Sequence, residues 1–189
     1  MRQLLNIICL VITIGASAQT SYFVDKKGKK QIVRDDAIDI ILIDKRISYK
    51  EVGKTWDKYI TYKDLDYAVV GPYYFKTFRF GKSKKDEAFF ICAESAQKRL
   101  LSMAVTYDVS YGSFSVTTVR YRILLIDNNN TILEELKFHN GGTDSEKHIA
   151  AAEMVRKHFS DCADVIERLD EEAHGIMGFF DDPEYIKCK

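Results

Sequence analysis

The chain has 189 residues, of which 46% are hydrophobic and 12% aromatic, and its 28 Lys and Arg residues balance 28 Asp and Glu residues. A net charge of zero argues against a basic nucleic-acid binder. The apolar fraction is too high for an intrinsically disordered chain, and the length suits one domain.

Residues 1–18 have the pattern of a secretory signal peptide. Arg2 precedes an apolar run over residues 4–14, and Ala16-Ser17-Ala18 is the small-x-small sequence that signal peptidase accepts. The run is shorter than the roughly 20 residues of a membrane span, and no later segment reaches that length. We therefore predict export to the periplasm or the cell exterior, with no transmembrane segment after cleavage. An uncleaved anchor or a buried N-terminal element is the alternative.

The remaining residues, 19–189, read as a single β-rich domain. Strand-like segments separated by turn residues follow one another over residues 21–138. The clearest has apolar side chains at every second position from Leu101 to Tyr107, which is the strand period. We predict an antiparallel meander of about 8–10 strands.

The turn at Asp127–Asn130 suggests a register for the last two strands. Pairing Ile126 with Thr131 places Arg122 opposite Glu135, an opposite-charge pair, and aligns apolar residues on the other face. We therefore expect this register.

After residue 143 the apolar spacing changes to three or four, which predicts an amphipathic helix over about residues 144–173. Thr143 and Glu146 form a capping-box pattern at its start. An unbroken helix would be about 45 Å long, and Ser160-Asp161 is a possible point for a break. The tail, residues 174–189, is expected to pack back on the domain. The predicted fold class is α+β, mainly β, with the meander packed on a long C-terminal helix.

Three cysteines follow the predicted cleavage site: Cys92, Cys162 and Cys188. Export places them in an oxidising compartment, where one pair could close and one thiol would be left over. Of the three pairings we favour Cys162 with Cys188, which would join the tail to the helix. The chain has no C-x-x-C motif, so a thioredoxin-like redox role has no support.

The candidate ligand site is the loop between the last strand and the helix, formed by His139, Asn140, Gly141, Gly142 and Thr143. Free N–H groups and the helix dipole at such a position can bind an anion. The competing interpretation is a tight glycine turn followed by a helix cap.

A metal site could be drawn from Asp144 and His148, which are spaced to share a helix face. Zinc catalysis needs three such ligands, and the chain has no H-E-x-x-H motif. No nucleophile elbow or phosphate-binding glycine motif is present either. We assign no catalytic residue, no metal and no cofactor.

The predicted outline is similar to two known folds, the helix-grip proteins and the lipocalin-like barrels. Gly53-Lys54-Thr55-Trp56 resembles the lipocalin Gly-x-Trp signature with one residue too many. More broadly, the chain resembles small exported Gram-negative bacterial proteins of unknown function. That similarity lies in Ser17-Ala18-Gln19 and in the Ile60–Tyr67 segment, and it implies no activity.

These observations favour a non-enzymatic exported module that binds a ligand or a partner. A protein, a glycan or an apolar small ligand would suit it, and nucleic acid would not. One alternative is a hydrolase that uses the His139–His148 region. Another is a structural component of the cell surface.

Overall fold

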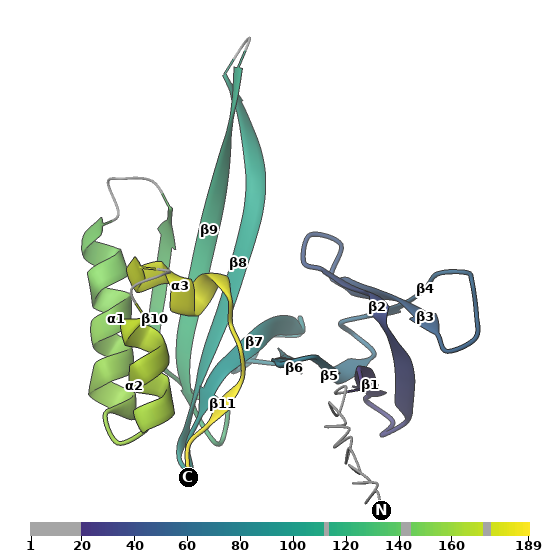
Figure 1. Cartoon of the computed structure of the whole chain (residues 1–189), viewed down its shortest axis with the longest axis horizontal. Helices are drawn as coiled ribbons and strands as arrows, with labels where there is room; N and C mark the ends of the chain where they lie inside the picture. The colour runs from purple at the N-terminus through teal and green to yellow at the C-terminus, as the bar shows by residue number, and fades with distance from the viewer. Residues whose placement is uncertain (1–19, 112–113, 141–144, 172–174) are drawn as a thin grey trace, which may run out of the picture.

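The computed structural model describes residues 20–111, 114–140, 145–171 and 175–189, so the predicted signal peptide lies outside it (Figure 1). The chain is mainly β, with one sheet and three short helices. The strands are β1 (Tyr22–Asp25), β2 (Lys30–Ile41), β3 (Arg46–Glu51), β4 (Lys58–Thr61), β5 (Leu65–Val70), β6 (Tyr73–Phe78), β7 (Glu87–Glu94), β8 (Lys98–Tyr111), β9 (Phe114–Asp127), β10 (Ile132–His139) and β11 (Ile186–Lys187). The helices are α1 (Ser145–Phe159), α2 (Ala163–Asp170) and α3 (Gly175–Asp181). Among the described residues, none of the helices combines the length and the apolar character needed to cross a membrane.

The sheet confirms the antiparallel β prediction, but the chain does not run through it as one continuous meander. The strand order is β10-β9-β8-β7-β6-β5-β1-β2-β3-β4. Strands β5 to β10 form a meander, whereas β1 lies between β5 and β2 and pairs with both of them. The short β11 adds a parallel pairing with β7, with Ile186 opposite Ala93. Tyr22 shows the double pairing of β1, because it lies opposite Ile32 on one side and Val69 on the other.

Strand β2 changes partner halfway along its length. It pairs with β1 up to Ile32 and with β3 from Val33, which lies opposite Glu51, and the register then shifts before Ile38. Such an irregularity bends the strand. The bend brings β2 and β3 over a buried cluster that contains Phe23, Ile47 and Phe75.

The single long helix predicted for residues 144–173 is wrong. Helix α1 ends at Phe159, and α2 begins only at Ala163, after Cys162 has taken an extended conformation with φ −105° and ψ 93°. The break lets both parts of the apolar stripe reach one core, because Phe159 of α1 and Val165 of α2 are buried in the same cluster.

The helices cover one face of the sheet and create the main core there (Figure 1). Val155 and Phe159 of α1 and Val165 of α2 are fully buried in the same cluster as Ile123 and Leu125 of β9. At the edge of this layer, Glu134 of β10 accepts hydrogen bonds from α1, including one of 2.6 Å from Lys157. The opposite face has its own buried cluster, which includes Phe89, Leu101 and Leu124.

The predicted register of β9 and β10 is also wrong, although side chains beyond a bulge keep their predicted faces. Ile126 lies opposite Ile132, and a bulge then places Glu135 opposite Leu124. The turn is set by Asp127, whose carboxylate accepts hydrogen bonds from the backbone N–H of Thr131 at 2.7 Å. Beyond the bulge the displacement from the predicted register is two residues, which returns each side chain to the same face.

Candidate functional site

In the predicted anion-binding loop, Asn140 has a structural role beside β10. Asn140 extends the β10 ladder, because its N–H donates to the Val119 carbonyl at 2.9 Å and its Oδ1 accepts from the Val119 N–H at 3.0 Å. The rest of the loop, Gly141, Gly142 and Thr143, lies outside the described residues.

The two histidines of the hydrolase hypothesis lie on opposite sides of β10. The ring of His139 contacts Tyr107, with 6.2 Å between centroids. The ring of His148 contacts Phe138, with 5.1 Å between centroids, and Phe138 belongs to the core beneath the helices. Neighbouring side chains in a strand point to opposite faces, so β10 separates His139 from His148. Within the described ranges, no three His, Cys, Asp or Glu side chains are grouped as a metal site would require.

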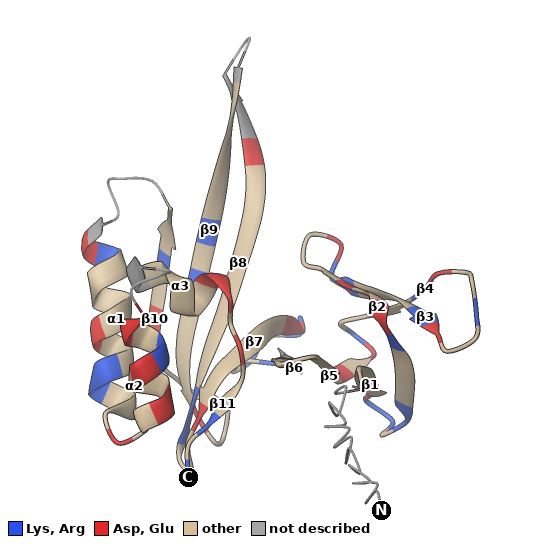
Figure 2. Cartoon of the chain, in the orientation of Figure 1, with Lys and Arg blue, Asp and Glu red and all other residues tan. Residues whose placement is uncertain are grey.

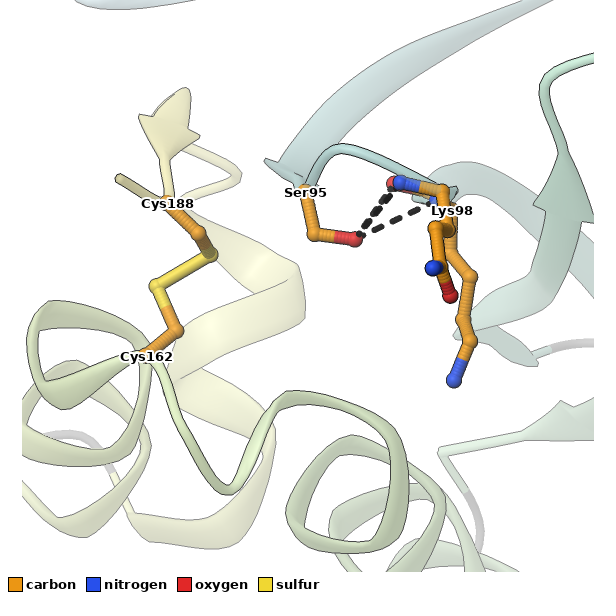
Figure 3. The surroundings of a disulfide bond; sticks show 5 residues. Ser95, Lys98, Cys162 and Cys188 are labelled. Carbon is orange, nitrogen blue, oxygen red and sulfur yellow. Dashed lines mark hydrogen bonds between the residues drawn. A yellow bond between two sulfur atoms is a disulfide. The ribbon is translucent and has the colours of Figure 1, made fainter.

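The structure joins Cys162 and Cys188, the favoured pair, in a disulfide with their Cα atoms 5.4 Å apart (Figure 3). The bridge lies beside the turn between β7 and β8, which Lys98 closes by donating its backbone N–H to the Ser95 hydroxyl at 3.2 Å. The Cys188 N–H also donates to the Glu94 carbonyl at 2.8 Å, so the tail is attached at two points. Cys92 is a buried free thiol whose pKa is raised by burial, which makes it a poor nucleophile.

A cleft lies on the helix-covered face of the sheet. Its volume is about 310 Å³, at the lower end of the range for small-molecule sites. Phe90 of β7 and Ala104 of β8 belong to the sheet, while β2 lines one part of the cleft and the end of α3 another. We call it the interlayer cleft and define it by its lining residues: Ile38, Asp39, Ile40, Val70, Tyr73, Phe90, Ala104, Phe180, Asp181, Asp182 and Pro183.

The interlayer cleft combines an apolar interior with an acidic rim. All of its charged lining residues are aspartates: Asp39, Asp181 and Asp182. Acidic residues mark the end of α3 and the segment after it, coloured red in Figure 2. Arg168 pairs with Asp182 at 3.1 Å, whereas Asp39 and Asp181 have no ion-pair partner in the described part of the chain. Asp39 alternates along β2 with the apolar side chains that line the cleft, so its carboxylate points to the other face of the strand. Asp181 is therefore the carboxylate that the rim offers to a positively charged group.

Two tyrosine hydroxyls hold the carboxylates at the α3 end. Tyr73 donates to Asp182 at 2.6 Å, and Tyr121 donates to Asp181. The hydrogen bond to the carboxylate, helped by burial, raises the pKa of Tyr73 to about 12. Burial and the hydrogen bond to Asp181 likewise raise the pKa of Tyr121. Both phenols stay protonated near neutral pH and orient the carboxylates that they contact. Because a protonated phenol is a weak nucleophile, we do not assign these pairs as a nucleophile with its general base.

The sequence alone does not predict this cleft. Its lining residues come from five separate parts of the chain, and no local motif connects them. The one usable signal was the change from apolar Phe179-Phe180 to acidic Asp181-Asp182 in the tail, which suggests a helix end at a surface. Comparisons with protein-family models, with curated proteins and with solved structures returned no match.

Proposed function

We propose that this protein is an exported, non-catalytic binding module whose interlayer cleft takes a small ligand with an apolar body and a cationic group. The observation that carries the proposal is the unbalanced acidic rim above an apolar interior. The export signal and the resemblance to small exported bacterial proteins support a place in the periplasm or outside the cell.

The geometry of the cleft supports this ligand class. Ile38, Ile40 and Phe90 offer apolar surface for the body of the ligand, and burying that surface provides the main driving force. Asp181 would accept hydrogen bonds from an ammonium or guanidinium group, which are stronger than those between neutral partners. An anionic ligand would meet like charge from every ionised group in the lining.

A binding role fits the described residues better than the hydrolase alternative. The separation of His139 from His148 by β10 removes the acid–base pair on which that alternative depended. The two hydroxyls beside the cleft donate to carboxylates, and the free thiol of Cys92 is buried away from solvent.

Titration calorimetry with hexylamine, hexanol and hexanoate tests the proposal, because the three probes share an apolar chain and differ in charge. We expect hexylamine to bind more tightly than hexanol, and hexanoate should not displace hexylamine. Asp181→Asn should weaken hexylamine binding by about tenfold, or about 1.4 kcal/mol, and leave hexanol binding unchanged.

A matched control is Glu167→Gln. Glu167 is exposed on α2 away from the cleft lining and has no described ion pair, so its replacement changes the net charge equally. If the control variant weakens hexylamine binding as much as Asp181→Asn does, the effect is only overall charge and the proposed site is wrong.

A further inference from the structure

A second cavity lies at the β2–β3 turn and shares no lining residue with the interlayer cleft. It consists of two adjoining hollows of about 230 and 430 Å³, of which the smaller is the more enclosed. Four residues line both of them: Lys45, Tyr62, Lys85 and Asp86. The enclosed hollow is also lined by apolar side chains of the β2–β3 turn, β7 and β8, namely Leu42, Ala88, Met103 and Val105.

The charges around this cavity are unbalanced in favour of lysine. Four lysines line it, and in the part of the chain that the structure describes none of them has an ion-pair partner: Lys45, Lys63, Lys84 and Lys85. Every carboxylate in the lining is already paired with a cation from outside it. Asp86 pairs with Lys26 at 2.8 Å and with Arg79 at 3.0 Å.

The other two carboxylates are paired in the same way. Asp44 pairs with Arg46 at 2.9 Å, and Glu87 pairs with Arg122. The lysine charge is therefore left without compensation from the chain, and it lies at the open end of an apolar hollow.

A buried hydroxyl gives independent evidence for a ligand. Tyr62 lines both hollows and is only 4% exposed, and its hydroxyl oxygen is buried with no hydrogen-bond partner among the described residues. Its ring is held in place against Phe75, with 5.5 Å between centroids. Burial raises the pKa of this phenol, so it remains a donor near neutral pH. An unpaired buried donor is costly, and an anion entering the cavity would supply the missing acceptor.

We propose that the cavity at the β2–β3 turn binds an amphipathic anion, an unbranched apolar chain that ends in a single carboxylate. The chain would occupy the enclosed hollow between Leu42 and Met103. The head would accept the Tyr62 hydroxyl hydrogen bond and would be attracted by Lys45 and Lys85. This site is independent of the ligand proposed for the interlayer cleft.

Titration calorimetry with octanoate tests the site. Acetate supplies the head alone, octanol the chain alone, and octylamine the chain with the opposite charge. We expect octanoate to bind more tightly than acetate and octanol, and each methylene that is buried should tighten binding about fourfold. Octylamine has the charge that suits the interlayer cleft, so it should not displace octanoate. If octylamine displaces octanoate, the charge argument fails and the proposal is overturned.

Lys45→Gln combined with Lys85→Gln should weaken octanoate binding by about tenfold and leave octanol binding unchanged. The matched control is Lys27→Gln with Lys29→Gln, two exposed lysines in the β1–β2 turn. Equal losses in the two pairs would show that octanoate responds only to net charge. An octanoate site in the interlayer cleft would not respond to the Lys45 and Lys85 changes at all, and that outcome also overturns the proposal.

Tyr62→Phe separates ligand contact from structural support. The variant keeps the ring and loses only a hydroxyl that has no partner, so the unliganded chain should unfold at the same temperature or a higher one. Octanoate binding should weaken by about tenfold, while octanol binding should not change. A lower unfolding temperature would mean that the hydroxyl serves the fold. Unchanged octanoate binding would mean that the hydroxyl does not contact the ligand, and either result would contradict the proposal.

Discussion

Removing the Cys162–Cys188 bridge should cost this protein a large part of its stability. The bridge connects residues 26 positions apart, and closing a loop of that length in the unfolded chain corresponds to about 3.5 kcal/mol at 25 °C in the chain-entropy description. The double variant Cys162→Ala with Cys188→Ala removes the cross-link and leaves no unpaired thiol at either position. Its free energy of unfolding should fall by about 3.5 kcal/mol.

The folded state should survive this change, because the tail has other attachments. Ile186 pairs with β7, and the Tyr185 hydroxyl donates to Glu94 at 2.6 Å. Urea unfolding followed by circular dichroism measures the difference between the variant and the original chain. Adding a reductant provides the control, since it should destabilise the original chain by the same amount and leave the variant unchanged. A loss below about 1 kcal/mol would refute the loop-closure reasoning.

Two further predictions concern groups whose pKa is raised. The folded chain holds the Tyr73 proton more tightly than the unfolded chain, so the hydrogen bond to Asp182 stabilises fully below about pH 10 and is lost as the pH rises toward 12. Tyr73→Phe should therefore lower the urea midpoint near pH 8 and have a shrinking effect above about pH 10, whereas a constant effect would contradict this assignment. Burial raises the pKa of the Cys92 thiol, so this thiol should resist iodoacetamide until the chain unfolds. Peptide mapping would detect the labelled thiol, and rapid labelling of the folded chain would contradict its burial.

Local periodicity carried most of the fold prediction. The alternation around Leu101 to Tyr107 marks a strand, and the three-to-four spacing around Val155 and Phe159 marks a helix, because each pattern reflects which side chains must leave water together. The antiparallel, mainly β architecture follows from such patterns. So does the helix layer on one face of the sheet.

Registers and breaks did not follow from periodicity. The β9–β10 pairing depended on hydrogen bonds to Asp127 in the turn and on a bulge after Ile132. A displacement of two residues leaves each side chain on the same face, so the apolar pattern is satisfied by both registers. The break before Cys162 places residues of α1 and α2 in one buried cluster against the sheet, and that arrangement is a property of the whole fold.

The sequence by itself determined which segments become strands or helices and which side chains face the core, because these choices depend on neighbours within a few residues. Only the tertiary structure decided where the two candidate sites lie. The interlayer cleft joins Ile38 to Phe180, and the second cavity joins Lys45 to Met103. Residues so far apart meet only after the sheet has bent and the tail has returned, and no local preference encodes that meeting.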